Sequence, residues 1–342
     1  MTTATNGRRP RVLALPGPTL RAQLFTPETL AGLDVLADVD WSERDEPWSS
    51  EQLVAAIGAY DGLITGWGSP VITPEVLAAA TRLKVIAHSA GSVKHIIKED
   101  VLARGIKVSS AAIAMAPAVA EFSLILVLLG LRAVHEYDHG MRRAGHLWDG
   151  QTAYGVGQEF SAQRIGVVGA GGVGRIFIGQ ARALGAEVWV YDPYLPAETA
   201  AELGARQAEL DELMAGCPIV VVHAPVTPET RHMIGAAQLA LMPNNGYLVN
   251  TARSWVVDQD ALLAELRSGR IRAALDVYDT EPLPLDHPFR SLPNVILTPH
   301  IAGATIQARH RQGECVLRDL TNAFTGQPLA HEVTLERYAI LA

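Results

Sequence analysis

The second half of the chain contains three residues whose side chains could together act on a small carbonyl acid: Arg253, Glu281 and His300. A guanidinium keeps its charge and its planar fork matches a carboxylate, so Arg253 could hold the acid and polarise its carbonyl group. Imidazole titrates near neutral pH, which suits His300 to give or take one proton. Glu281 could orient that imidazole and favour its charged form. The set could bind a 2-oxo acid and protonate the alkoxide formed when its carbonyl is reduced.

Each of the three residues follows a short apolar run that is typical of a buried strand. These runs are Tyr247–Asn250, Ala273–Val277 and Val295–Leu297. The carboxyl ends of parallel strands lie along one edge of a sheet, where open α/β folds gather their catalytic groups. We therefore expect the three side chains to share one edge of one sheet.

A glycine-rich turn, Gly169-Ala170-Gly171-Gly172-Val173-Gly174, lies between an apolar run at Ile165–Val168 and a helical pattern at Val173–Leu184. Glycine permits the tight turn at the first position, close approach of a pyrophosphate at the second, and close packing of helix on strand at the third. The N-terminus of the helix then offers free N–H groups to the phosphates. A strand, this turn and a helix in succession predict a dinucleotide site that includes Gly169, Gly171, Gly172, Val173 and Gly174.

An aspartate after the next strand indicates which dinucleotide is bound. Asp192 follows Val188–Tyr191 and lies 18 positions beyond Gly174. A carboxylate there can accept hydrogen bonds from the adenosine ribose and would repel the 2′-phosphate of NADP. We therefore predict NAD as the cofactor.

Apolar runs alternate with helical patterns along the whole chain, which predicts an α/β fold with parallel sheets. In the first third we expect strands at Val12–Leu15, Gly62–Thr65 and Lys84–Ala87, with a helix at Pro74–Ala80. From Arg164 onward we expect six strands, which is the number in a full dinucleotide-binding sheet. They are Ile165–Val168, Val188–Tyr191, Ile219–Val222, Tyr247–Asn250, Ala273–Val277 and Val295–Leu297. Helices are expected at Asp258–Ser268 and from Ala304 to about Phe324.

Composition excludes several classes of function. A net charge of −8 without a long single-sign run does not suit a nucleic acid or an anionic membrane surface. Cys217 and Cys315 lie far apart, and the first 18 residues lack the apolar core of a secretory signal, so we expect a cytoplasmic protein with no metal site. Pro117 and Glu121 interrupt the apolar stretch Ala111–Leu131, which predicts a core or interface helix rather than a membrane span.

From about Asp61 to Ala304 the chain resembles the D-isomer-specific 2-hydroxyacid dehydrogenase family. Besides the glycine turn, the resemblance is carried by Val222-His223-Ala224-Pro225, Thr227-Pro228-Glu229-Thr230, Asn250-Thr251-Ala252-Arg253, Val257-Asp258, Ala274-Leu275-Asp276-Val277, Glu281-Pro282 and Thr298-Pro299-His300. It implies that Arg253, Glu281 and His300 are catalytic and that Asp276 lies near the nicotinamide amide. It also implies further NAD contacts from His223, Ala224, Pro225, Thr230, Thr251, Ala252 and Gly303.

The resemblance further implies two doubly wound parallel-sheet domains and a homodimer. A flavodoxin-like substrate domain would comprise residues 1–116 and 307–342, and a Rossmann NAD-binding domain residues 117–306. The apolar helix Ala118–Leu131 would help to form the subunit interface. The resemblance also implies an activity: the protein would interconvert a 2-oxo acid and its 2-hydroxy acid with NAD(H).

The substrate loops depart from the family pattern. Gly91 and Ser92 stand in a loop where the family often has Gly-x-Gly-x-Asp-Asn, and their N–H groups could still bind a substrate carboxylate. Gly66 and Trp67 are further candidate substrate contacts. Since the segment Gly66-Trp67-Gly68 lacks the arginine that phosphoglycerate dehydrogenases of this family place nearby, we expect a small unphosphorylated acid.

Two other functions remain open at this stage. A protein of the same fold could bind NAD(H) as a sensor without catalysis, like the corepressors that dimerise on the cofactor. Alternatively, an NAD-dependent enzyme could oxidise another small anion, such as phosphite. The sensor function leaves the combination of Arg253, Glu281 and His300 unexplained.

Overall fold

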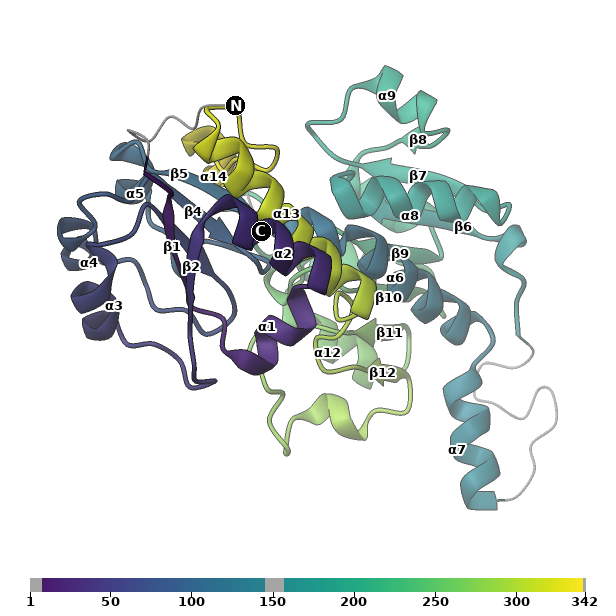
Figure 1. The fold of residues 1–342 in the computed structure, drawn as a ribbon. Helices are drawn as coiled ribbons and strands as arrows, with labels where there is room; N and C mark the ends of the chain where they lie inside the picture. The colour runs from purple at the N-terminus through teal and green to yellow at the C-terminus, as the bar shows by residue number, and fades with distance from the viewer. Residues whose placement is uncertain (1–7, 145–156, 341–342) are drawn as a thin grey trace. The chain divides into compact units, whose positions relative to one another are not determined.

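The computed structural model describes residues 8–144 and 157–340, and the chain divides into two compact units (Figure 1). Unit 1 comprises Met1–Met115 and Ala304–Ala342, and unit 2 comprises Ala116–Gly303. The boundaries between the units, at residues 115/116 and 303/304, lie within three residues of the expected domain boundaries at 116/117 and 306/307. The expectation about a leader segment falls in part on residues 1–7, which lie outside the described residues.

Unit 1 contains a five-stranded parallel sheet in the order β2-β1-β3-β4-β5, which is the flavodoxin-like order. The strands are β1 (Arg11–Ala14), β2 (Asp38–Trp41), β3 (Gly62–Thr65), β4 (Val85–His88) and β5 (Lys107–Ser110). The three central strands match the predicted runs within a residue. The sequence did not reveal β2 and β5, because neither reads as an apolar run: β2 alternates exposed and half-buried residues, and β5 reads Lys-Val-Ser-Ser although three of its four residues are buried.

Helices from both ends of the chain cover this sheet (Figure 1). They are α1 (Pro18–Leu24), α2 (Pro27–Leu36), α3 (Ser50–Ile57), α4 (Pro74–Ala79), α5 (Glu99–Ala103), the 3₁₀ helix η1 (Ala111–Met115), α13 (Ile306–Phe324) and α14 (Leu335–Ile340). The long C-terminal helix α13 starts at the Thr305 side chain, which accepts a hydrogen bond from Ala308 N–H. Its buried residues Val316 and Leu320 share an apolar core with strand residues Val12 and Val85, so the C-terminal segment completes unit 1.

Unit 2 contains a seven-stranded parallel sheet in the order β12-β11-β10-β9-β6-β7-β8. The strands are β6 (Arg164–Val168), β7 (Glu187–Tyr191), β8 (Arg206–Gln207), β9 (Ile219–Val222), β10 (Tyr247–Asn250), β11 (Arg272–Leu275) and β12 (Val295–Leu297). The strand order reverses between β6 and β9, which is the place where doubly wound sheets bind dinucleotides. The predicted fold class, a Rossmann sheet and a flavodoxin-like sheet, is confirmed. The additional strand β8 has only two residues, both exposed, at the sheet edge.

The helices of unit 2 include those predicted at Ala118–Leu131, Val173–Leu184 and Asp258–Ser268. They are α6 (Ala116–Leu131), α7 (Val134–Ala144), α8 (Gly172–Ala183), α9 (Ala197–Glu202), α10 (Leu210–Gly216), α11 (Ala236–Leu241) and α12 (Gln259–Arg267), with 3₁₀ turns η2 (Phe160–Ala162), η3 (Ser254–Val256) and η4 (Pro288–Ser291). Helix α8 begins and ends one residue earlier than predicted. Asp258 caps α12 by accepting hydrogen bonds from Asp260 N–H and Ala261 N–H, which fixes where that helix starts.

The apolar stretch Ala111–Leu131 is long and hydrophobic enough to cross a membrane, but the core helix of a soluble protein meets the same criteria. Within unit 2, α6 packs against α8 and β10. Tyr247 donates its hydroxyl to the Leu126 carbonyl at 2.9 Å, and its ring lies so close to Gly130 that any side chain there would collide. The helix therefore has one face that belongs to the core of unit 2. Ile125 and Leu128 on it are 48% and 38% exposed.

Candidate functional site

The glycine turn joins β6 to α8 at the carboxyl edge of the unit 2 sheet. Gly169 has φ +96°, in the region that only glycine adopts readily, and a side chain there would come within 2.7 Å of Ala224 N. A side chain on Gly174 would collide with the Gly169 carbonyl. By contrast, a side chain on Gly171 would meet no atom within 4 Å. Two glycines are thus required by the turn itself, whereas the second glycine of the motif borders open space that a ligand could fill.

Asp192 lies directly beside this turn. Its Oδ2 accepts a 2.7 Å hydrogen bond from Ala170 N–H, and its Oδ1 accepts one of 2.9 Å from Tyr194 N–H. A carboxylate offers about four acceptor positions, so further acceptor capacity remains for ribose hydroxyls. The side chain is half-buried, and its place after β7 is the one expected from the sequence.

His223 follows β9 behind the glycine turn and provides a second indication of a bound group. Its ring nitrogens are both buried, and neither has a hydrogen-bond partner among the described residues. Burial lowers the pKa of His223 to about 3, so the ring is neutral and contains one N–H donor and one acceptor without partners. The ring of Phe177 packs against it at a centroid distance of 5.4 Å. Such unpaired buried groups, behind Gly169 and Gly174 of the glycine turn, fit a site that accommodates a cofactor.

The other expected cofactor residues line two loops at the same sheet edge. Ala224 and Pro225 follow β9, and the Thr230 hydroxyl folds the loop by donating to the Pro225 carbonyl at 2.6 Å. Thr251 follows β10 and shares a 2.7 Å hydrogen bond with the buried hydroxyl of Ser123 on α6. Ala252 N–H donates to Asn250 Oδ1 at 3.0 Å. These contacts shape the loops, and the contacts of the same residues with a cofactor stay predictions.

Glu281 and His300 form a close hydrogen-bonded pair in unit 2. His300 Nδ1 donates to Glu281 Oε2 at 2.6 Å, and Glu281 Oε1 accepts from Tyr278 N–H at 3.0 Å. Because a carboxylate only accepts hydrogen bonds, this contact places a proton on Nδ1 and leaves Nε2 to act on a substrate. The imidazole side chain is 47% exposed, as a proton donor to a bound molecule must be.

Asp276 holds the loop that carries His300. Its carboxylate, fully buried, accepts hydrogen bonds from the Thr298 hydroxyl at 2.6 Å, from Ile301 N–H at 3.0 Å and from Ala302 N–H at 2.9 Å. Between these anchors His300 has φ +55°, a conformation that costs a non-glycine residue about 1 kcal/mol or more. The buried carboxylate therefore imposes the backbone turn that directs the imidazole toward Glu281.

Arg253 extends from the loop after β10. Its Nη1 donates to the Ala252 carbonyl at 2.7 Å, and the side chain is half-buried. Burial lowers the pKa of Arg253, while the negative charge of Glu281 acts in the opposite direction. The three predicted catalytic residues thus occupy loops at one edge of the sheet, and Arg253 experiences the negative charge of Glu281.

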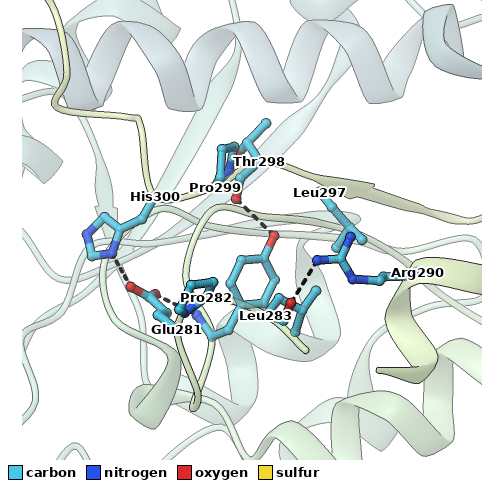
Figure 2. Close-up of a pocket in the computed structure, with 9 residues that line it drawn as sticks. Glu281, Pro282, Leu283, Arg290, Leu297, Thr298, Pro299 and His300 are labelled. Atoms are coloured by element: carbon cyan, nitrogen blue, oxygen red, sulfur yellow. Dashed lines mark hydrogen bonds and ion pairs between the residues drawn. The ribbon is translucent and has the colours of Figure 1, made fainter. Parts of the chain in front are cut away.

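A cavity of about 680 Å³ adjoins the pair. Figure 2 shows the Glu281 carboxylate turned toward the His300 ring, with Arg290 on the opposite wall. Tyr278 donates its hydroxyl to the Thr298 carbonyl at 2.9 Å, which ties the Glu281 loop to the His300 loop. Among the described residues no cluster of three His, Cys, Asp or Glu side chains could hold a metal ion.

The expected substrate residues of unit 1 lie at the carboxyl ends of β3 and β4. Gly66 follows β3, and a side chain on it would come within 3.0 Å of the Ser89 hydroxyl. Trp67 is 41% exposed. Gly91 and Ser92 follow β4, where the Gly91 carbonyl accepts from the Ser110 hydroxyl at 3.0 Å. Both pairs stand at the edge where such sheets bind ligands.

Several residues that shape these sites had no role assigned to them from the sequence. Asn250 bridges the Arg253 loop, because its amide accepts from Ala252 N–H and donates to the Arg253 carbonyl. Tyr278 and Thr298 brace the Glu281 and His300 loops. Each acts through a partner that lies in another loop or at a backbone atom, so residue type alone did not identify it.

Comparison with known proteins identifies the family. Residues 124–302 match the model of the D-isomer specific 2-hydroxyacid dehydrogenase, NAD binding domain. A D-3-phosphoglycerate dehydrogenase of Methanocaldococcus jannaschii is 34% identical over 86% of this chain and 56% of its own, so this chain spans little more than half the length of that relative. A glyoxylate reductase of Aeropyrum pernix is 33% identical over 92% of each chain. The crystal structure of PH0520 from Pyrococcus horikoshii, at 27% identity, covers 96% of both chains with a TM-score of 0.80.

The glycine turn with Asp192, the loops after β9 and β10, and the Glu281–His300 pair all fall within the stretch that the family model matches. The chain therefore belongs to the D-isomer specific 2-hydroxyacid dehydrogenase family, and residues 124–302 are its NAD-binding domain.

Proposed function

We propose that the protein transfers a hydride between NAD(H) and a small unphosphorylated 2-oxo acid or its 2-hydroxy acid. The observation that supports this most directly is the 2.6 Å hydrogen bond between Glu281 and His300, with the charge of Arg253 nearby. A carboxylate that fixes Nδ1 and leaves Nε2 exposed prepares an imidazole for proton transfer to a substrate. Neither a structural histidine nor a binding protein needs that arrangement.

In this proposal each side chain has one task. Arg253 binds the substrate carboxylate and polarises the 2-oxo group, for which a desolvated guanidinium is well suited. When the carbonyl carbon accepts the hydride, its oxygen takes up the bond electrons and then the proton from His300 Nε2. His300 becomes neutral, and its hydrogen bond to Glu281 keeps the remaining proton on Nδ1. In the oxidising direction neutral His300 removes the hydroxyl proton instead.

The cofactor assignment for individual residues is part of the proposal. Gly171, Gly172 and Val173 would meet the pyrophosphate at the start of α8, and Asp192 would accept from the ribose. The loops after β9 and β10, with Asp276 and Gly303, would border the nicotinamide half. A bound nicotinamide would supply or accept the hydride. The unpaired nitrogens of His223 support this assignment.

The substrate class follows from the relatives and from unit 1. The relatives compared above are named for phosphoglycerate and for glyoxylate, and the segment Gly66-Trp67-Gly68 contains no cation for a phosphate. We infer that unit 1 is a substrate-binding domain in which Gly66, Trp67, Gly91 and Ser92 contact a small acid.

An NADH-consumption assay over a panel of 2-oxo acids tests the proposal. Glyoxylate, hydroxypyruvate and small 2-oxo acids should be reduced, and 3-phosphohydroxypyruvate should be a poorer substrate. Phosphite with NAD serves as the control for oxidation of another anion. NAD(H) binding without turnover of any of these compounds would favour the sensor function instead, and would contradict the proposal.

We also propose a cytoplasmic homodimer. Ile125 and Leu128 on α6, and Val134 and Met141 on α7, are exposed apolar side chains on consecutive helices that a second copy could cover. Light scattering after size exclusion should give twice the chain mass of 36.6 kDa. Leu128→Asp should shift the protein toward the monomer, whereas a monomeric parent would contradict the proposal.

A further inference from the structure

One hydroxyl group on the apolar helix α6 reaches the loop that carries Arg253. Ser123 lies in the middle of α6, is fully buried, and shares a 2.7 Å hydrogen bond with the hydroxyl of Thr251. Thr251 directly follows β10 and is 5% exposed. Both residues belong to unit 2, although 128 positions separate them in the chain. The bond therefore joins a helix to a loop inside one compact unit.

The direction of this hydrogen bond follows from the protons available. Ser123 has one O–H group, and it donates to the Val119 carbonyl one helical turn earlier at 2.8 Å. The Ser123 oxygen can then only accept, so the proton in the 2.7 Å bond comes from Thr251. Without Ser123 the Thr251 hydroxyl would be a buried donor that has lost its acceptor, which is unfavourable.

A second hydrogen bond fixes α6 along the same strand. Tyr247, the first residue of β10, donates its hydroxyl to the Leu126 carbonyl at 2.9 Å, whereas Thr251 follows the last residue of that strand. Ser123 and Leu126 are three positions apart and so lie on one face of the helix. Because α6 is bonded to β10 near both ends of the strand, it can serve as a fixed support for the loop beyond.

The loop after β10 connects the position of Thr251 to that of Arg253. Ala252 follows Thr251, and its carbonyl accepts a 2.7 Å hydrogen bond from Arg253 Nη1. Ala252 N–H and the Arg253 carbonyl are both bonded to the side chain of Asn250, at 3.0 Å each. These three bonds close the turn at residues 250–253. A displacement of Thr251 would therefore move the peptide group that holds the guanidinium.

We propose that Ser123 is a positioning residue for the reaction, because it accepts the Thr251 hydrogen bond and so holds the loop from which Arg253 binds the substrate carboxylate. The inference rests on the proposed function, which assigns that task to Arg253. Binding of the carboxylate contributes to KM, and polarisation of the 2-oxo group contributes to kcat. A displaced Arg253 should therefore raise KM and lower kcat together.

Ser123→Ala tests the inference with the 2-oxo acid that the parent reduces fastest. The value of kcat/KM should fall by roughly tenfold, as expected when a buried donor loses its acceptor, and a rise in KM should account for part of the loss. A variant that is merely less stable would contain fewer folded molecules, which lowers the apparent kcat and leaves KM unchanged. A parent-like KM in Ser123→Ala would overturn the inference.

Thr251→Val removes the other hydroxyl of the pair and keeps the shape of the side chain. It leaves no unpaired donor, so it also serves as the second variant if Ser123→Ala does not fold, and it too should raise KM. The double variant should lose about as much kcat/KM as Thr251→Val alone, because both substitutions remove one and the same hydrogen bond. Losses that multiply in the double variant would show that the two hydroxyls act independently, contrary to the inference.

The matched control is Thr321→Val on α13. The Thr321 hydroxyl also donates to the carbonyl four positions earlier, that of Leu317, at 2.8 Å, but its helix belongs to unit 1. This variant loses a hydroxyl of the same kind and should keep the parent KM. A rise in KM equal to that in Ser123→Ala would mean that any such loss disturbs the substrate site, and would overturn the assignment to Ser123.

Hydrogen exchange gives a readout that does not depend on turnover. The Ala252 N–H should exchange roughly tenfold faster in Ser123→Ala than in the parent, because the turn that protects it has lost its support on α6. Equal exchange rates contradict the inference, whatever the kinetics are. A parent that reduces no 2-oxo acid contradicts the proposed function instead, and faster exchange at Ala252 would then still show that Ser123 holds the loop.

Discussion

Asp276 accepts a hydrogen bond from the backbone N–H of Ile301, the residue directly after His300, at 3.0 Å. Together with the bonds from Thr298 and Ala302, this contact makes a buried carboxylate the anchor of the loop that presents the imidazole. The resemblance to the family implied that Asp276 lies near the nicotinamide amide. The structure shows that Asp276 also holds the His300 loop, because its carboxylate accepts three hydrogen bonds from that loop.

Asp276→Asn should therefore disturb the His300 loop. The amide presents N–H groups where the carboxylate accepted them, so at least one buried donor loses its partner, at a cost of about 1–3 kcal/mol in unfolding free energy. We expect a loss of kcat and faster hydrogen exchange at Ile301 and Ala302. Asp286→Asn, at an exposed position of the neighbouring loop, is the control. Parent-like exchange at both amides would show that the carboxylate does not hold the loop.

Glu281→Gln should lower kcat in both directions. The carboxylate accepts the 2.6 Å hydrogen bond that keeps a proton on His300 Nδ1, whereas an amide can also present an N–H group there and hold the imidazole in the wrong tautomer. The measurement is kcat and KM in both directions. A parent-like kcat would show that Glu281 does not orient His300.

His300→Ala should reduce the rate far more, on the order of 10²- to 10⁴-fold, because it removes the proton donor itself. Binding of NADH should be nearly unchanged, since the predicted cofactor contacts other than Gly303 lie on other loops. Stopped-flow turnover and fluorescence titration of NADH separate the two effects. A variant that retains a tenth or more of the parent rate would exclude His300 as the general acid.

The NAD preference should depend on Asp192. The parent should favour NAD over NADP by at least roughly tenfold in kcat/KM, about 1.4 kcal/mol, because the carboxylate repels the 2′-phosphate. Asp192→Ala should reduce this ratio. The same substitution removes the acceptor of Ala170 N–H at 2.7 Å, so a general loss of affinity for both cofactors is also expected. Equal use of NAD and NADP by the parent would refute the role of Asp192.

Two buried histidines should make the protein sensitive to acid. Burial lowers the pKa of His88 and of His223 to about 3, whereas an unfolded histidine titrates near 6.5. Between these values the unfolded chain binds more protons, so the unfolding free energy should fall as pH drops below about 6.5, by about 1.4 kcal/mol per pH unit for each residue. Urea unfolding between pH 6 and pH 4 measures the slope. His88→Gln and His223→Gln should each reduce the slope of unfolding free energy against pH by about 1.4 kcal/mol per pH unit. The control His139→Gln, at an exposed position, should leave the slope unchanged. Parent-like slopes in the first two variants would show that these histidines are not buried in their neutral form.

Features that depend on neighbouring residues along the chain could be predicted from the sequence. The glycine turn and Asp192 follow from backbone constraints within one strand, turn and helix, and the central strands are uninterrupted apolar runs because both of their faces are buried. Arg253, Glu281 and His300 each follow such a run, so their common sheet edge was predictable as well. Edge strands β2 and β5 were not predicted, because β2 alternates exposed and half-buried residues and β5, although buried, contains one lysine and two serines among its four residues.

Only the tertiary structure brought together partners that lie far apart in the sequence. Asp276 meets Ile301 across 25 positions, Ser123 meets Thr251 across 128, and Arg309 reaches Trp67 from the other end of unit 1. A single aspartate, serine or arginine has the same residue type whether it faces water or a buried partner. Its role is decided by which strands are adjacent and which helix packs across them, and local sequence patterns do not encode that order.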